Sequence, residues 1–238
     1  MGRRAFLLLP VLLALPLIYH YARPLWVPVY QAVVGKRTVN DVIDTHGTKA
    51  KANLEPYFVW AGVVYPPESI VLLATKKQRQ LELWAESAGS VRFIRSYSIQ
   101  AASGVVGPKL YEGDRQVPEG IYDIEYLNPN SRYHLSMKLN YPNAFDRLHA
   151  QAEGRNQPGS DIFIHGKAVS IGCLAMGDEA IEELFTLVAT IGRQNVQVII
   201  APDDPRREDI LPLAEDKPDW VKVLYEQISD RFSRYRRS

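Results

Sequence analysis

The sequence is short of cysteine and of net charge, and each shortage excludes a class of protein. Cys173 is the only cysteine among the 238 residues, so no disulfide can form within the chain and a zinc site made of several cysteines is excluded. Lysine and arginine number 28 against 27 aspartates and glutamates, which leaves a net charge of +1. Because nucleic-acid binding depends on a dense positive surface, we expect no nucleic-acid partner. Internal repeats and low-complexity segments are also absent from the sequence, which has the composition of a folded protein.

The first segment, residues 1–34, is expected to be a signal peptide or a signal-anchor. Arg3 and Arg4 precede an apolar run at residues 5–19, a pattern typical of an export signal. A membrane-spanning helix needs roughly 20 apolar residues, and no clear small-x-small cleavage site follows the run, so both forms stay open. In both, the two arginines stay in the cytoplasm and the rest is periplasmic or anchored in the inner membrane facing the periplasm. A buried helix that begins a soluble domain is the remaining alternative.

The rest of the sequence predicts an α+β protein with a β-rich core and peripheral helices. Strands are expected from alternating or short apolar patterns at residues 70–74, 81–84, 91–99, 122–126, 133–139, 162–164 and 196–200. Helices are expected from apolar periodicity at residues 38–54, 178–191 and 218–233, with Asp178 as a cap. The expected organisation is a helical connector at 35–66, a catalytic core at 67–202 and a C-terminal helical extension at 203–238 with a basic tail.

The segment from His165 to Cys173 contains the residue types that thiol catalysis needs. A predicted buried strand ends at His165, and Ser170 and Gly172 come shortly before the thiol. A thiolate is a strong nucleophile and a nearby imidazole can take its proton, so we expect a thiol pKa lowered by His165. Gly172 permits a close backbone approach, and the N–H groups of Gly172 and Cys173 are expected to face the developing oxyanion. The alternative is a buried, inert cysteine and a histidine that completes a strand-end hydrogen bond.

The motif of His-Gly at 165–166 and Ser-x-Gly-Cys at 170–173 resembles the signature of the L,D-transpeptidase catalytic domain of the YkuD type. The eight-residue separation of His165 and Cys173, with Ala-Met at 175–176, resembles the YafK-like branch of that family. The resemblance extends over residues 37–201 and includes four further segments. These segments lie at residues 70–84, 107–114, 118–122 and 139–147.

The resemblance implies cysteine-dependent chemistry on peptidoglycan. Cys173 would attack the diaminopimelate carbonyl of a stem peptide, with release of the terminal D-Ala, and an amine of a second stem would resolve the thioacyl-enzyme. His165 would act as general base and acid, with Ser170 and Gly172 in support. The substrate contacts expected on this resemblance are Tyr141, Asn143 and Lys109. It implies no metal and no cofactor. The expected partners are peptidoglycan stem peptides, a wall-linked lipoprotein and, through the N-terminal segment, the inner membrane.

One position departs from the family pattern. The arginine that most crosslinking members carry two residues after the cysteine is Ala175 in this sequence. The absence of that cation favours a second hypothesis, a hydrolase of the same fold that cleaves diaminopimelate-linked crosslinks or wall-attached protein. A third hypothesis is a non-catalytic wall-binding scaffold, which has no need of a free thiol beside a histidine.

Overall fold

The computed structural model describes residue 29, residues 35–87 and residues 89–237. Apart from Val29, the predicted export segment lies outside the described residues. Among the residues that are described, no helix combines the length and the apolar character needed to cross a bilayer. The fold is that of the compact unit Val39–Ser238.

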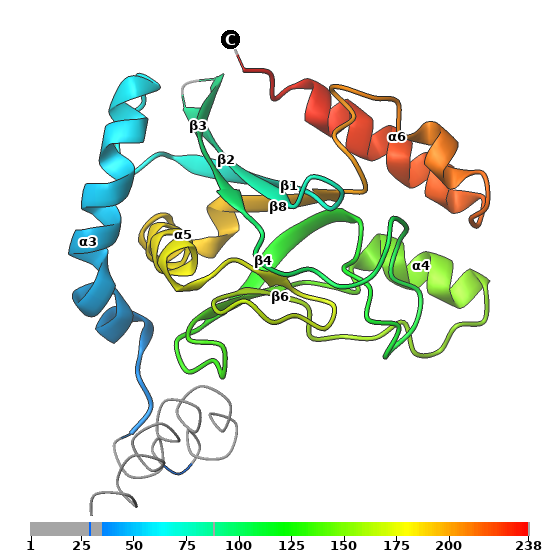
Figure 1. Cartoon of the computed structure of the whole chain (residues 1–238), viewed down its shortest axis with the longest axis horizontal. Helices are drawn as coiled ribbons and strands as arrows, with labels where there is room; N and C mark the ends of the chain where they lie inside the picture. Colours follow the sequence, from blue (N-terminus) through cyan, green and yellow to red (C-terminus); the bar gives the residue numbers. More distant parts are fainter. Residues whose placement is uncertain (1–28, 30–34, 88, 238) are drawn as a thin grey trace, which may run out of the picture. The chain divides into compact units, whose positions relative to one another are not determined.

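A mixed sheet of eight strands forms the centre of this unit (Figure 1). The strands are β1 Ser69–Thr75, β2 Gln80–Ser87, β3 Ser90–Ser98, β4 Gly120–Asn128, β5 Ser136–Leu139, β6 Phe163–His165, β7 Leu174–Ala175 and β8 Val196–Ala201. Their order is β3-β2-β1-β8-β4-β5-β6-β7, with β1 parallel to β8, β6 parallel to β7, and the other neighbours antiparallel. The predicted strands therefore all have a counterpart, and the two-residue strand β7 was not predicted.

Helices cover both faces of the strands around β1. The α-helices are α3 Val39–Trp60, α4 Ala144–Ala152, α5 Asp178–Ile191 and α6 Trp220–Ser233, with short 3₁₀ turns at Arg193–Asn195 and Leu211–Ala214. Leu72 belongs to the apolar cluster that contains residues of α3 and α5, whereas its neighbours Val71 and Leu73 belong to the cluster that contains α6. Because successive side chains of a strand point to opposite faces, β1 is buried on both sides, which explains its continuous apolar sequence.

Two helices differ from the sequence prediction. The predicted helix at 38–54 continues through Pro56 to Trp60, because Leu54 and Phe58 lie on its buried face and hold the helix against the core. Helix α4 was not predicted. Asn143 caps it through a capping box with Asp146, in which each side chain accepts a hydrogen bond from the other residue's backbone N–H.

The predicted strand at 133–139 begins only at Ser136. Ser136 pairs with Asn128 of β4 and with His165 of β6, and His134 adopts a left-handed backbone with φ +78°. An alternating pattern specifies side-chain direction but not a backbone partner, so only the residues flanked by β4 and β6 form a strand.

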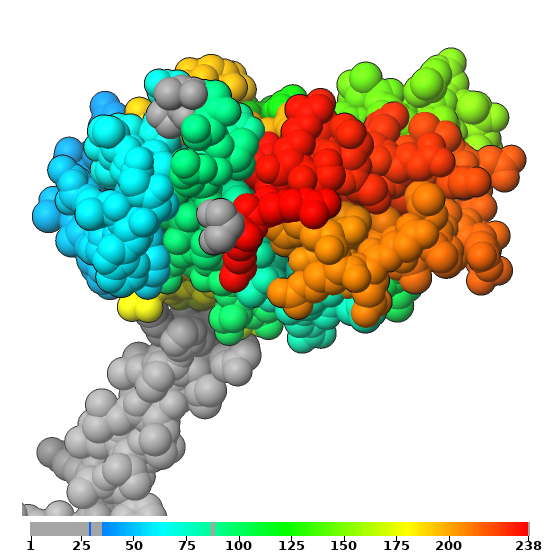
Figure 2. Space-filling model, turned by 90° about the horizontal axis from the view of Figure 1, so that it is seen from above, coloured from blue at the N-terminus to red at the C-terminus, as the bar shows by residue number. Residues whose placement is uncertain are grey.

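The C-terminal tail packs against the outer strands. Arg237 donates a hydrogen bond of 2.7 Å to the buried Glu82 of β2 and places its guanidinium 3.8 Å from the Phe93 ring of β3. Tyr235 donates a hydrogen bond of 2.7 Å to Glu86. Figure 2 shows this red segment lying against the green edge of the sheet. The tail's arginines thus include one with a buried carboxylate partner, which ties the tail to the core.

Candidate active site

His165 lies at the end of β6, in the interior of the protein. Its backbone is held on both sides, because it pairs with Ser136 of β5 and with Ala175 of β7, and its side chain is buried. The Nδ1 atom lies 2.6 Å from the carbonyl oxygen of Gly166. Since a carbonyl can only accept, Nδ1 carries the proton and Nε2 has the free lone pair in the neutral ring. Burial lowers the pKa of His165, so the imidazole is neutral at pH 7 and suited to accept a proton.

The surroundings of Gly166 explain why glycine follows the histidine. A Cβ atom at this position would lie 2.6 Å from the carbonyl oxygen of Tyr133 and 2.8 Å from the carboxylate of Asp178. That carboxylate accepts a hydrogen bond of 3.0 Å from the backbone N–H of Lys167 and pairs with the Lys167 ammonium. The Tyr133 ring stacks on the His165 imidazole with centroids 4.5 Å apart. The chain therefore turns tightly after the histidine, and an aromatic ring covers one face of the imidazole.

Asp178 does not cap α5 as the sequence predicted. The N-cap residue is Gly177, which makes no side-chain capping bond, and Asp178 is the first helical residue. Its carboxylate binds Lys167 instead, because the turn after His165 brings that lysine to the start of the helix.

A short loop held by two serines carries the thiol. The Ser170 hydroxyl accepts a hydrogen bond of 3.0 Å from the N–H of Cys173 and donates one of 2.6 Å to the Cys173 carbonyl. The Ser103 hydroxyl accepts a hydrogen bond of 2.6 Å from the backbone N–H of Gly172. Gly172 has φ +92°, a conformation that favours glycine. The sequence predicted that both N–H groups face the oxyanion, whereas in this structure the hydroxyls of Ser103 and Ser170 occupy them.

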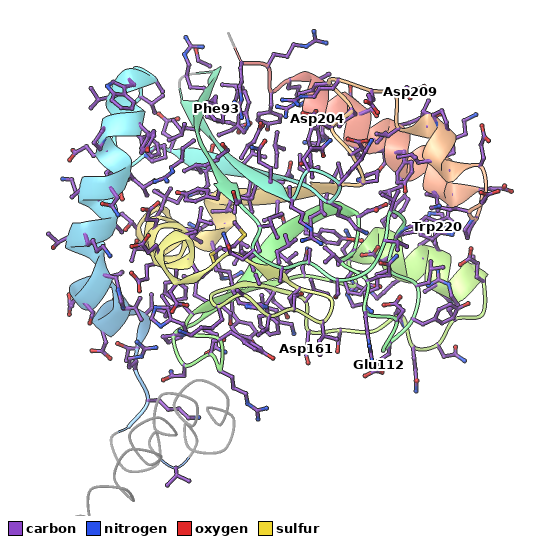
Figure 3. The ribbon with its side chains drawn as sticks, in the orientation of Figure 1. Phe93, Glu112, Asp161, Asp204, Asp209 and Trp220 are labelled. Atoms are coloured by element: carbon purple, nitrogen blue, oxygen red, sulfur yellow. The ribbon has the colours of Figure 1, made fainter. Side chains whose placement is uncertain are left out.

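The thiol of Cys173 belongs to a partly buried side chain, and its pKa is raised. Its Sγ lies 3.8 Å from the backbone carbonyl oxygen of Asp161. Asp161 lies on the loop before β6 and is labelled in Figure 3. Burial raises the pKa of the Cys173 thiol, and the carboxylate of Asp161 acts in the same direction. The N–H of Phe163 and the ammonium of Lys109 lower the pKa but do not prevail. The predicted lowering of the thiol pKa by His165 is therefore wrong for this structure, in which the thiol is protonated at neutral pH.

His165 ends β6, and Cys173 comes directly before the neighbouring strand β7. Strands β6 and β7 run parallel, with Ile164 opposite Leu174 and His165 opposite Ala175, so Cys173 comes directly before the strand that flanks the histidine. An imidazole and a thiol are the groups that serve as general base and nucleophile in thiol catalysis. The arrangement suits acyl transfer through a thioester, and a substrate carbonyl would have to enter beside the Asp161 loop.

A sequence profile of the YkuD family, described as the L,D-transpeptidase catalytic domain, matches residues 68–200, more than half of the 238-residue chain. The chain belongs to this family. The YafK protein of Escherichia coli strain K12 is 38% identical over an alignment of 132 residues, and the match covers 53% of this chain and 51% of that protein. The match thus spans about half of that relative's length.

Two solved structures are similar at lower identity. The helical cell shape determining protein Pgp2 from Campylobacter jejuni matches with a TM-score of 0.47 and 18% identity, over 71% of this chain and 70% of that chain. Bd1075 of Bdellovibrio bacteriovorus matches with a TM-score of 0.42 and 21% identity, over 70% of this chain and 74% of that chain.

In this member of the YkuD family, two of the three predicted substrate contacts, Tyr141 and Lys109, touch each other, and Asn143 caps α4. Tyr141 is buried, and its hydroxyl lies 3.2 Å from the carbonyl of Lys109 and 2.9 Å from that of Pro158. The Lys109 ammonium is bound to the carboxylate of Asp114 and to the carbonyl of Tyr111. These polar groups are satisfied within the protein. A role in substrate binding stays a prediction for them.

Three residues near the motif were not predicted from the sequence. Ser103 holds Gly172 from 69 positions away, Tyr133 stacks on His165, and Asp161 contacts the thiol. None has a local sequence signal, because each acts through a contact between segments that are distant in the chain. The role of Asn143 did have a signal. Asn-x-x-Asp before an apolar periodic segment is typical of a helix start.

Alkylation of the thiol should follow its raised pKa. Because iodoacetamide reacts with the thiolate, we expect the rate constant to keep rising above pH 8.5, about the ordinary thiol pKa. Cys173 is the only cysteine, so intact-mass spectrometry reports on this site alone. The pH profile of the alkylation rate should have the same midpoint in the His165→Asn variant, since burial rather than the imidazole sets the pKa of the thiol. A midpoint near neutrality that His165→Asn abolishes would contradict this and restore the thiolate–imidazolium pair.

Replacing Asn143 separates a helix cap from a substrate contact. The Asn143 side chain accepts the N–H of Asp146 at 3.0 Å and donates to the carbonyl of Ile121 at 2.9 Å. Asn143→Ala should lower the free energy of unfolding by about 1–2 kcal/mol, measured by urea denaturation, because the cap is lost. Asn143→Asp keeps a capping oxygen and should recover part of the loss. We expect the KM for a stem-peptide substrate to stay unchanged in both variants. A raised KM in both, with normal stability, would instead show that Asn143 contacts the substrate.

Proposed function

We propose that this chain is a cysteine acyltransferase that acts on peptidoglycan stem peptides at diaminopimelate through a thioacyl-enzyme. One observation carries the proposal: within the region that matches the family, a neutral His165 with Nδ1 fixed on Gly166 ends β6, and Cys173 directly precedes the parallel neighbour β7. The predicted export segment is consistent with action in the periplasm, free or anchored to the inner membrane, where such a substrate lies.

In the proposed reaction the proton moves with the nucleophile. Nε2 of His165 takes the thiol proton as Sγ of Cys173 bonds to the diaminopimelate carbonyl carbon. The peptide bond to the terminal D-Ala then breaks, and the imidazolium gives its proton to the leaving amine. An amine of a second stem attacks the thioester, loses a proton to His165 and leaves a new amide and the free thiol.

The N–H groups at 172–173 contribute to this proposal only if their serine partners move. An oxyanion would compete with the hydroxyls of Ser103 and Ser170 for the N–H groups of Gly172 and Cys173. A charged acceptor makes the stronger hydrogen bond, so the developing oxyanion can displace a neutral hydroxyl. The serines would then hold the loop in shape before the substrate arrives.

The second candidate function is hydrolysis, and Ala175 favours it. Ala175 has no exposed surface, and its N–H and carbonyl bond to Ala101 and Gln100 at 3.0 and 2.8 Å. An arginine side chain would not fit there without displacing packed neighbours, so the cation expected in crosslinking members has no equivalent at this position. With water as acceptor, the same acyl-enzyme would yield cleavage of diaminopimelate-linked crosslinks or release of a wall-linked lipoprotein.

Purified sacculi separate these functions. The full chain would be incubated with sacculi that carry tetrapeptide stems, crosslinks and attached lipoprotein, and the digested products would be analysed by mass spectrometry. New 3–3 dimers with free D-Ala support the transferase. Loss of dimers or of attached lipoprotein, without new dimers, supports the hydrolase. Binding to sacculi with no change in any product would overturn both and support a scaffold.

A further inference from the structure

We propose that His46, His134 and Glu182 form a binding site for a divalent transition metal, with zinc as the best fit. The three residues come from separate parts of the chain. His46 lies on α3, His134 lies in the turn before β5, and Glu182 lies on the first turns of α5. The site is separate from the proposed acyl-transfer chemistry, and its function goes beyond that proposal.

The geometry brings the ligand atoms together around the carboxylate. Nδ1 of His46 lies 3.3 Å from one oxygen of Glu182, and Nε2 of His134 lies 2.8 Å from the other. The two imidazole rings are nearly perpendicular, at 86°, with centroids 5.5 Å apart. One ligand atom from each residue falls within 4.8 Å of the other two. All three side chains are partly buried, with exposures of 16–17%, so the cluster is sheltered but open to solvent.

These spacings are close to those of a zinc centre. Ligand atoms at about 2.0–2.2 Å from a tetrahedral zinc ion lie roughly 3.3–3.6 Å from one another. The separation of His46 Nδ1 and the Glu182 carboxylate, 3.3 Å, already has this value. The 2.8 Å between His134 Nε2 and that carboxylate would have to lengthen by about 0.5 Å for zinc to sit between them. Two imidazoles and one carboxylate are a known zinc ligand set, with a fourth position left for water. Calcium and magnesium prefer oxygen ligands throughout, so this donor set selects against them.

The backbone at His134 supports a built site. Its φ of +78° is unusual for a residue other than glycine and costs free energy that the surroundings must offset. This conformation directs the imidazole to Glu182, and the adjacent residue Tyr133 stacks on His165. A metal ion bound by these three residues would tie α3 to α5 and would fix the turn that carries Tyr133. The competing interpretation is a hydrogen-bonded trio in which Glu182 accepts from both imidazoles without metal.

Zinc binding to the full chain with Cys173→Ala tests the proposal without interference from the thiol. After dialysis against a chelator, calorimetry with zinc should give one tight site per chain. At a free zinc concentration of about 100 times Kd, the melting temperature should rise by about 5–10 °C, whereas magnesium should have no effect. Glu182→Gln and His46→Asn should each remove this site and the temperature rise. His149→Asn is the matched control, because His149 stacks on Trp220 outside the cluster. Its loss should change neither the binding of zinc nor the rise in melting temperature.

The outcomes are distinct. Retention of the tight site in both Glu182→Gln and His46→Asn, with unchanged circular dichroism, would place the metal elsewhere and overturn the proposal. Failure of zinc to bind the folded chain or to raise its melting temperature would overturn it in favour of the hydrogen-bonded trio. Zinc binding and the melting temperature are measured without any enzymatic readout, so these results do not depend on the acyltransferase proposal, and the sacculus assay does not depend on zinc.

Discussion

Cys173→Ala should abolish D-Ala release from tetrapeptide stems, with a fall in kcat of at least about ten-thousand-fold, because the proposed reaction has no other nucleophile. The measurement is single-turnover release of D-Ala, followed by mass spectrometry of the stem products. The variant should fold normally, since alanine keeps the backbone of the loop and the Sγ contact with the carbonyl of Asp161 is long, at 3.8 Å. Unchanged circular dichroism and binding to sacculi serve as the folding control. Turnover that persists in the variant would show that the thiol is not the nucleophile.

A double variant asks whether His165 and Cys173 act as one unit. His165→Asn alone should also lower kcat strongly, because the thiol of Cys173 has a raised pKa and needs a base to remove its proton. In the Cys173→Ala background, the same substitution should cause no further loss, since groups that act on one step are not additive. Independent, multiplicative losses would mean that the histidine acts elsewhere, for example in folding of the turn at Gly166.

The sequence predicts those elements whose burial pattern is local. The apolar run at 70–74 corresponds to β1, and the apolar periodicity at 178–191 corresponds to α5. A strand buried on both faces and an amphipathic helix can both be recognised from the order of their apolar residues. The strand expected from residue 133 begins at Ser136 instead. Its first residues have the alternation but no neighbouring strand, and the left-handed His134 ends any regular pairing.

The site shows the same division between local and distant information. The motif at 165–173 predicts a nucleophile and a base, and the structure places His165 at the end of β6 and Cys173 directly before the neighbouring strand β7. The state of the thiol could not be predicted, because burial and the distant residue Asp161 determine it. The same holds for the N–H of Gly172, whose partner Ser103 comes from another loop. A local motif specifies which groups are present, whereas their protonation and hydrogen bonding depend on packing.

A buried ion pair connects the sheet to the loop that carries Ser103. The ammonium of Lys76, just after β1, lies 2.9 Å from the carboxylate of Glu119, just before β4, and the side chains are 7% and 0% exposed. Lys76 also donates to the carbonyls of Gly107 and Val117 at 2.9 and 3.0 Å. Glu119 accepts the N–H of Gly107 and the hydroxyl of Tyr225 of α6, both at 2.7 Å. Both charges are therefore hydrogen-bonded inside the protein, where Lys76 at the end of β1 holds two carbonyls of the loop and Glu119 lies at the end of that loop.

Removal of one partner should be far more costly than removal of both. Lys76→Met leaves the Glu119 carboxylate buried without a cation, and we expect a loss of about 3–5 kcal/mol in the free energy of unfolding, measured by urea denaturation. Lys76→Met with Glu119→Gln removes both charges and should recover a large part of that loss, because replacing a buried pair is often close to neutral.

The neighbouring lysine provides the control for this pair. Lys77 pairs with Asp203 but is 56% exposed, so Lys77→Met should change stability much less than Lys76→Met. If the two lysine variants proved equally stable, the buried pair would have no special part in the fold. If Lys76→Met alone is destabilised, the loop of Ser103 should loosen with it. The N–H of Gly172 would then lose its partner, and protection of that amide from hydrogen exchange should fall in Lys76→Met and return in the double variant.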